Sequence, residues 1–195
     1  MIRKWITGVI ALICIAATAV AEDAPAFTLT DTQGNEHSLS DFEGKVVVLE
    51  WFNRGCPFVK KHYSGGNMQS LQKTYTGKGV VWLTVISSTP GKQGHDSAEG
   101  HNKTAEEWKM EPTAILMDED GTVGKAYGAK TTPHMYVINE EGEIVYQGAI
   151  DDKRSTNPDH IPDSTNYVRQ ALDAVLADEE VEVTRTNPYG CSVKY

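Results

Sequence analysis

The sequence predicts an α/β fold in which a central mixed β-sheet is flanked by helices, in the order β-α-β-α-β-β-α. Two observations predict it. Residues 45–51 and 80–87 are rich in valine and lack alternating polar residues, which is typical of strands buried on both faces. Helical segments separate these strands, and a hairpin follows them, so the sheet closes on antiparallel strands.

Turn residues divide the first half of the chain. Residues 27–30 are an expected short strand, and turns lead from it to the buried strand 45–51. Pro57 predicts the start of a helix just after that strand, because proline is favoured at the first helical position. Residues 64–66, Ser-Gly-Gly, predict a break in this helix, and the glycines within 77–79 predict its end.

The second half continues the alternation. Residues 102–110 have a helical pattern, and the apolar run within 113–118 predicts a third strand. Residues 133–150 predict a hairpin with its turn at Glu141-Gly142. An amphipathic helix is expected over 167–177.

The N-terminus predicts a secretory signal peptide. Arg3 and Lys4 precede an apolar run over 5–20, and Ala19-Val20-Ala21 fits the small-residue rule for cleavage. The competing interpretation is a membrane anchor. A span needs about 20 strongly apolar residues, and threonines and a glycine weaken this run. We therefore expect a signal peptide at 1–21 and a secreted, periplasmic protein.

The mature chain, 22–195, is expected to form one domain whose last part, 179–195, is a C-terminal tail. The whole chain has a formal net charge of −9. This acidity predicts no binding to nucleic acid, and no binding to a membrane after signal cleavage. Cys14 leaves with the signal peptide, so Cys56 and Cys191 remain. A secreted domain of this size does not need a disulfide to fold, which favours a chemical role for these two.

Cys56 lies in the segment "EWFNRGCPF", in a polar turn between a buried strand and a helix. Unpaired N–H groups at a helix N-terminus favour the thiolate, and Arg54, Lys60 and Lys61 add positive charge. We therefore expect an exposed, reactive cysteine with a lowered pKa. The alternative is a small buried hydrophobe, the usual role of an isolated cysteine.

The segment "VVVLEWFNRGCPF" and the "TTP" that opens the hairpin resemble the thioredoxin fold. The chain looks like the redoxin branch, which comprises the alkyl hydroperoxide reductase and thiol-specific antioxidant family and related periplasmic thiol-disulfide oxidoreductases. The resemblance covers residues 24–177. It implies that Cys56 is the nucleophile and that Thr132-Pro133 is a cis-proline loop facing it. Thr132, Pro133, Arg54 and Asn53 are the substrate-binding candidates.

The chain departs from both patterns of this family. Val59 stands where thiol-disulfide oxidoreductases have a second cysteine, and Leu49 and Asn53 stand where peroxiredoxins have a proline and a threonine. With the C-terminal "PYGCSVKY", the chain resembles a less characterised peroxiredoxin-like subgroup. Cys191 is then the candidate resolving cysteine. The alternative is a free thiol in a frayed tail.

The resemblance implies a thiol-dependent oxidoreductase without a cofactor or metal. Its substrate would be a peroxide or a disulfide-containing protein, and an external thiol would reduce it. Two alternatives stay open. Cys56 with His134, and with Met135 or His62, is one set of ligands for copper(I), as in a metallochaperone. The fold is also compatible with a redox-inactive binding module. Lys60, Lys61 and His62 otherwise read as a solvated helix face.

Overall fold

The structure, a computed structural model, describes residues 22–195. The predicted signal peptide, 1–21, lies outside these residues, and so does Cys14. Across the described range, no helix has the length and apolarity required to cross a bilayer.

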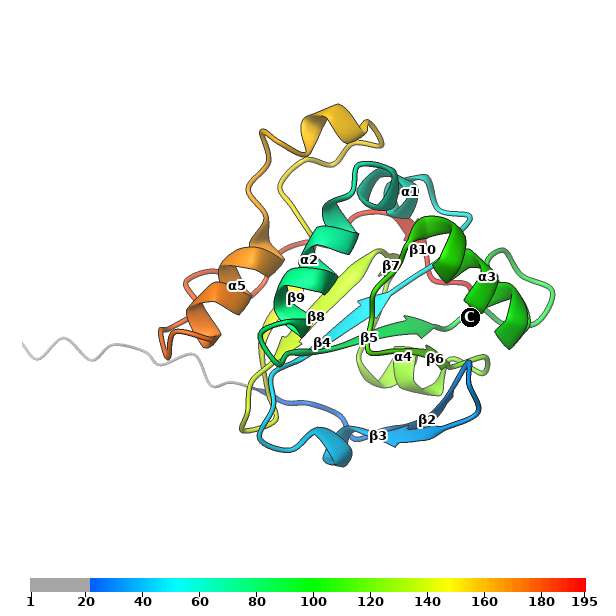
Figure 1. The fold of residues 1–195 in the computed structure, drawn as a ribbon, viewed down its shortest axis with the longest axis horizontal. Helices are drawn as coiled ribbons and strands as arrows, with labels where there is room; N and C mark the ends of the chain where they lie inside the picture. The colour runs from blue at the N-terminus through cyan, green and yellow to red at the C-terminus, as the bar shows by residue number, and fades with distance from the viewer. Residues whose placement is uncertain (1–21) are drawn as a thin grey trace, which may run out of the picture.

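One eight-stranded mixed sheet forms the centre of the molecule (Figure 1), in the order β1-β9-β8-β4-β5-β6-β2-β3. The middle strands β4, β5 and β6 run parallel, and β8 pairs antiparallel with β4. The strands are β1 (Glu22–Asp23), β2 (Thr28–Asp31), β3 (Glu36–Ser38), β4 (Val47–Trp51), β5 (Val81–Ile86), β6 (Ala114–Met117), β8 (His134–Ile138) and β9 (Glu143–Gly148). A separate two-stranded sheet joins β7 (Thr131–Thr132) to β10 (Cys191–Ser192).

Helices cover both faces of the sheet. The apolar residues of α1, α2, α3 and α5 pack on one face, whereas α4 and the 3-10 helix η1 pack on the other. The bounds are α1 (Pro57–Ser64), α2 (Asn67–Thr76), α3 (Ala98–Trp108), α4 (Thr122–Ala126), α5 (Tyr167–Val175), η1 (Leu39–Phe42) and η2 (Pro158–His160). The predicted class is confirmed. The predicted third strand is β6, and the observed order is longer because α4 follows it and the short strands β1, β3, β7 and β10 are added.

Two predicted helix boundaries have clear local causes. The break between α1 and α2 falls at Gly66, whose φ of 71° is a left-handed conformation that glycine adopts without strain. Helix α3 begins earlier than the predicted residue 102, because the side chain of Ser97 accepts a hydrogen bond from the Gly100 N–H and caps the helix there.

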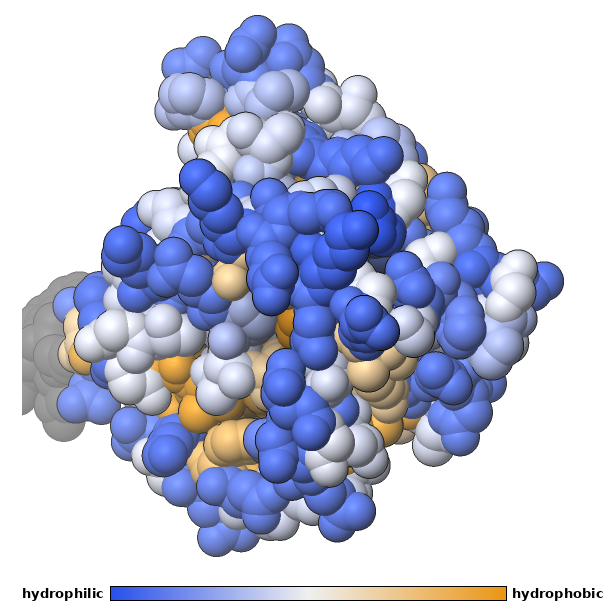
Figure 2. All heavy atoms as spheres, turned by 45° about the vertical axis from the view of Figure 1, so that its right-hand side comes forward, coloured by the Kyte–Doolittle hydropathy of each residue, from blue (hydrophilic) through white to orange (hydrophobic). Residues whose placement is uncertain are grey.

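Strand β4 lies between two apolar cores. Val48 faces the cluster under α1 and α2, whereas Val47, Leu49 and Trp51 face the other cluster. All four are fully buried or nearly so, and burial of each such side chain contributes about 1.5–3 kcal/mol. Outside the cores, the face drawn in Figure 2 is mostly hydrophilic, and apolar atoms show mainly in its hollows. Because its side chains are buried in both cores, the end of β4, where the polar turn begins, is held in a fixed place.

Candidate active site

The turn after β4 places Cys56 at the start of α1. The side chain of Asn53 accepts a hydrogen bond from the Gly55 N–H at 2.8 Å and donates one to the Gln93 carbonyl at 2.9 Å. The Cys56 N–H bonds back to the Asn53 carbonyl at 3.0 Å. Cys56 is the N-cap residue, and Pro57 is the first residue of the helix. Asn53, a predicted substrate-binding residue, thus shapes the turn that carries the cysteine.

Cys56 is fully buried, with 0% of its surface exposed. The prediction of an exposed cysteine is therefore wrong. The Cys56 thiol donates a hydrogen bond to the Thr132 carbonyl oxygen, which lies 2.9 Å from Sγ. The C-terminal tail contributes to this burial, because Cys191 packs against the apolar cluster that contains Cys56. A local sequence pattern does not reveal such a cover.

The loop facing Cys56 has the predicted conformation, since the Thr132-Pro133 peptide bond is cis. Just before it, β7 pairs antiparallel with β10, so that Cys191 stands opposite Thr132. Gly190 permits this approach: a Cβ atom there would lie 2.0 Å from the Thr132 carbonyl oxygen. The backbone of Thr132 thus touches both cysteines.

The two thiols are close enough to change each other's pKa. Burial raises the pKa of Cys56, but hydrogen bonds from the backbone N–H groups of Cys191 and Val59 and from the Cys191 thiol leave it below its ordinary value. The Thr132 side chain is a further cause that lowers the pKa of Cys56. Burial, the hydrogen bond to Cys56 and the charge of Cys56 raise the pKa of Cys191 to about 11. In the reduced pair, Cys56 is therefore the more acidic thiol.

The tail is also held beyond Cys191. The Val193 N–H donates to the Lys130 carbonyl at 3.1 Å, and the Thr89 N–H donates to the Lys194 carbonyl at 2.9 Å. The Tyr195 hydroxyl donates to the Ala129 carbonyl at 2.8 Å. These contacts contradict the alternative of a frayed tail.

The charges that were expected to support the thiolate lie elsewhere. The Arg54 guanidinium faces Asp96 at 4.0 Å and Glu107 at 3.7 Å. Lys61 is completely buried and pairs with Asp151 at 2.9 Å. The largest effects that lower the pKa of Cys56 are thus those of N–H groups, not of these side chains. The prediction that Lys61 and His62 belong to a solvated helix face is wrong, because both are buried.

The histidines proposed for copper have other partners. His62 bonds to Asn67 and lies 3.3 Å from the Tyr189 hydroxyl. His134 is buried, and its Nδ1 accepts a hydrogen bond from the Lys130 N–H at 3.3 Å. Within residues 22–195, no three His, Cys, Asp or Glu side chains gather in a way that could hold a metal ion. Nothing in this geometry favours the copper alternative.

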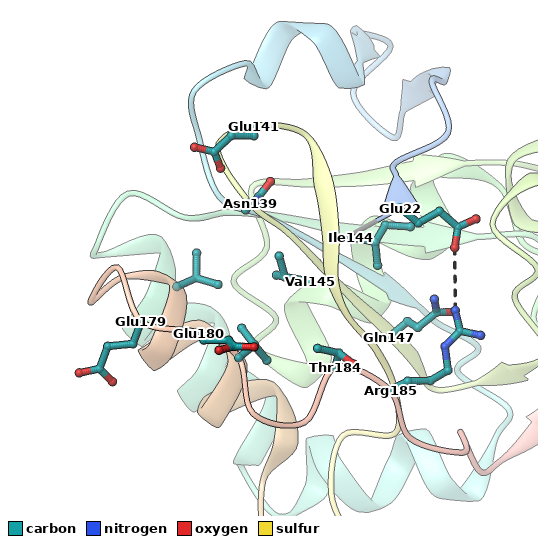
Figure 3. A pocket seen from close by; sticks show the side chains of 12 residues that line it. Glu22, Asn139, Glu141, Ile144, Val145, Gln147, Glu179, Glu180, Thr184 and Arg185 are labelled. Atoms are coloured by element: carbon teal, nitrogen blue, oxygen red, sulfur yellow. Dashed lines mark ion pairs between the residues drawn. The ribbon is translucent and has the colours of Figure 1, made fainter. Parts of the chain in front are cut away.

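One surface hollow bears on access to the site, and a second one elsewhere does not. One of about 660 Å³ adjoins the Cys56 turn, and its rim carries Arg54, Gly55, Lys60, Trp108 and Lys109. The other, about 360 Å³, is a groove between β9 and residues 175–185 (Figure 3), and no cysteine lines it. Only the first borders the reactive turn.

Sequence reasoning missed Glu50 as a candidate functional residue. It is fully buried on β4, and its carboxyl accepts hydrogen bonds from Trp82 at 2.9 Å and from Tyr63 of α1 at 2.8 Å. Burial raises the pKa of Glu50 to about 7, against the opposing effect of these donors. A single carboxylate inside the apolar run 46–52 was the available signal.

Comparisons with known proteins agree with this fold. A model of the AhpC/TSA family matches residues 20–147. Thiol-disulfide oxidoreductase ResA of Geobacillus kaustophilus is 31% identical over 128 residues, 66% of this chain and 68% of that protein. A protein of Coxiella burnetii named as peroxiredoxin bcp is 27% identical, over 64% of this chain and 84% of its own length.

Solved structures extend the similarity to nearly the whole chain. A conserved protein from Geobacillus kaustophilus, described as uncharacterized, is 33% identical with a TM-score of 0.80, and the match covers 91% of this chain and 92% of that one. Thioredoxins are also among the solved structures that the chain resembles. The chain therefore has a thioredoxin-like fold and belongs to the AhpC/TSA family, whose members include thiol-disulfide oxidoreductases and peroxiredoxins.

Proposed function

We propose that residues 22–195 are a secreted, periplasmic thiol oxidoreductase in which Cys56 is the nucleophile and Cys191 the resolving cysteine. The observation that carries the proposal is that both cysteines meet the backbone of Thr132: Cys191 pairs with it, and the Cys56 thiol donates to its carbonyl. Val59 cannot resolve an oxidised Cys56, and Cys191 is the other cysteine of residues 22–195. The signal peptide predicted at 1–21 is consistent with the oxidising compartment that such a pair needs.

With a peroxide, the Cys56 thiolate attacks one oxygen. An S–O bond forms, the O–O bond breaks, and the departing oxygen takes a proton to leave as water or an alcohol. The Cys191 sulfur then attacks the sulfenic sulfur: the S–S bond forms, the S–O bond breaks, and hydroxide leaves with the Cys191 proton as water. An external dithiol reduces the disulfide and restores both thiols.

The pKa coupling suits this order of events. In the reduced pair, the negative charge of Cys56 is one of the causes that raise the pKa of Cys191. A sulfenic acid has no such charge, so oxidation of Cys56 lowers the pKa of Cys191. Cys191 becomes the better nucleophile at the moment when the second step requires one.

A second candidate activity is thiol-disulfide exchange, and the similarity to ResA favours it. Cys56 would attack a substrate disulfide to give a mixed disulfide, and Cys191 would displace the substrate thiol. An extended polypeptide would have to pair with β7, where β10 already lies. While β10 stays in place, we therefore expect a small peroxide or small disulfide to be the preferred oxidant.

The Cys191→Ser variant tests the resolving role. We expect one equivalent of hydrogen peroxide to join Cys56 to Cys191 in the native chain, and to leave Cys56 as a trappable sulfenic acid or an intermolecular disulfide in the variant. Peptide mapping by mass spectrometry, with and without dimedone, distinguishes the products. If the native chain yields no linked peptide, Cys191 has no resolving role and the enzyme works with one cysteine.

The Gly190→Ala variant tests whether the tail covers Cys56. The added Cβ would lie 2.0 Å from the Thr132 carbonyl oxygen, so β10 must move away from β7. In a Cys191→Ser background, Cys56 is the single thiol of residues 22–195. We expect iodoacetamide to alkylate Cys56 at least roughly tenfold faster after Gly190→Ala. Destabilising the paired position of β10 by about 1.4 kcal/mol raises the population of chains with β10 displaced about tenfold.

Gly142→Ala is the matched control. It also places a side chain at a positive φ, 85°, but in the hairpin turn, where nothing lies within 4 Å of the new Cβ. We expect no change in Cys56 alkylation. Equal rates in the Gly190→Ala variant and its parent would show that the tail does not limit access.

A further inference from the structure

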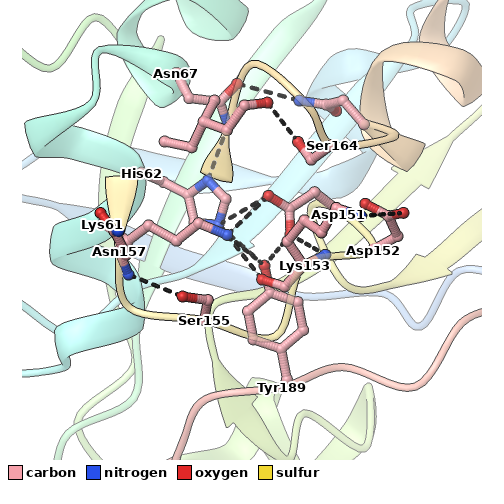
Figure 4. Close-up of polar contacts among 12 residues, drawn as sticks. Lys61, His62, Asn67, Asp151, Asp152, Lys153, Ser155, Asn157, Ser164 and Tyr189 are labelled. Atoms are coloured by element: carbon pink, nitrogen blue, oxygen red, sulfur yellow. Dashed lines mark hydrogen bonds and ion pairs between the residues drawn. The ribbon is translucent and has the colours of Figure 1, made fainter. Parts of the chain in front are cut away.

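A buried polar cluster ties the C-terminal tail to the helix that carries Cys56 (Figure 4). Its members are Lys61 and His62 of α1, Asp151 after β9, and Tyr189 of the tail. Lys61 Nζ donates to Asp151 Oδ2 at 2.9 Å and to the Lys153 carbonyl at 2.8 Å. The Tyr189 hydroxyl donates to the other carboxylate oxygen of Asp151.

Stability alone is a weak explanation for this cluster. The side chains of Lys61 and Asp151 are 0% and 1% exposed, so both charges have lost their hydration. A buried ion pair of this kind contributes little compared with apolar side chains of similar volume. The ring of Tyr189 already packs edge-on against Phe58, with centroids 5.6 Å apart. Its hydroxyl, by donating to Asp151, adds a directional contact that the ring packing does not provide.

The orientation of Tyr189 affects the placement of Cys191, because Tyr189 lies two residues before it. Gly190 lies between them and passes close to the Thr132 carbonyl, and Cys191 then pairs with Thr132. A shift of the tail by one residue would turn Cys191 away from Cys56, since side chains alternate along an extended strand. Lys61 and Cys56 belong to the same helix end, so the cluster fixes both thiols against one element.

We propose that Tyr189, held by Asp151 and Lys61, is a positioning residue that sets the register of the tail and so brings Cys191 to Cys56. This inference rests on the proposed resolving role of Cys191. Tyr189 takes no part in the bond changes at the two sulfur atoms. It acts by raising the effective concentration of Cys191 at Cys56.

The test is Tyr189→Phe, which keeps the ring and removes the hydroxyl. Equilibration with mixtures of reduced and oxidised glutathione gives the effective concentration of the Cys56–Cys191 pair. We expect it to fall roughly ten- to a hundredfold, the range for loss of a hydrogen bond to a charged group. A second readout is the ultraviolet absorbance of the Cys56 thiolate against pH. Its midpoint should rise, because the Cys191 N–H that stabilises the thiolate is no longer held in place.

Tyr195→Phe is the matched control. It removes a hydroxyl from the same tail, one that bonds the Ala129 carbonyl outside the cluster. We expect a change of less than about threefold in effective concentration, because a neutral hydrogen bond contributes less. Urea unfolding of both reduced variants reports stability separately.

The outcomes separate the two proposals. If the native chain forms no Cys56–Cys191 disulfide, the resolving role itself is wrong. If the native chain forms it, and Tyr189→Phe matches the native effective concentration or loses no more than Tyr195→Phe, the resolving role stands and Tyr189 is not a positioning residue.

Discussion

We expect Cys56→Ser to abolish both peroxide reduction and disulfide exchange while the domain stays folded. A serine hydroxyl does not ionise near neutral pH and cannot form a sulfenic acid or a disulfide. Loss of an enzyme's nucleophile lowers turnover by roughly a thousandfold or more. Serine is smaller than cysteine, and its hydroxyl can donate to the Thr132 carbonyl as the thiol does, so little strain arises in the core.

The measurement is the rate of peroxide consumption with a dithiol reductant, together with urea unfolding of the reduced protein. Cys191→Ser is the matched control: it keeps the nucleophile, so its first oxidation of Cys56 should remain while its cycle slows. Native-level turnover in Cys56→Ser, of peroxide or of disulfide, would mean that the proposed nucleophile is wrong.

The placement of this nucleophile follows largely from local sequence. The valine-rich run ends at Trp51, a polar turn follows, and Pro57 starts the helix, so Cys56 at the N-cap could be predicted. The cis bond before Pro133 followed from the resemblance alone. Each of these features is determined by residues within a few positions of one another, or by a pattern that the family shares.

The resolving role expected for Cys191 already places the tail near Cys56, but the strand that covers the site could not be predicted. Strand β10 has two residues and no periodicity, and what fixes it is a tertiary contact with β7. Lys61 was expected in solvent because its partners are distant in sequence: Asp151 lies 90 positions away and Tyr189 lies 128 away. Charged residues on a helix are usually solvated, and only the folded chain reveals the exception.

Glu50→Gln is expected to change how the stability of the fold depends on pH. The carboxyl lies in the core under α1 and is 0% exposed. Burial is the main cause that raises its pKa, from 4.5 to about 7. The folded state therefore favours the protonated acid, whereas the unfolded chain releases the proton at lower pH.

The sign follows from this difference. The contribution of Glu50 to stability is fully present below pH 4.5 and is lost as the pH rises through about 7. The difference between the two pKa values corresponds to about 3 kcal/mol of unfolding free energy. His62 acts in the opposite direction: burial is the main cause that lowers its pKa to about 4, so its contribution is present above 6.5 and is lost as the pH falls. The native curve combines these contributions with those of other groups whose pKa is shifted, such as His134.

The difference between the two curves of unfolding free energy against pH, Glu50→Gln minus native, isolates the contribution of the Glu50 carboxyl. The amide keeps the shape of the side chain and does not titrate. We expect the unfolding free energy of the variant, relative to the native chain, to rise by about 3 kcal/mol from pH values below 4.5 to values above 7. Urea unfolding under reducing conditions measures it. Glu140→Gln, at an exposed position, controls for removing one carboxyl from the chain. A constant difference across this range would mean that Glu50 ionises alike in the folded and unfolded states, and that its buried hydrogen bonds fully offset its desolvation.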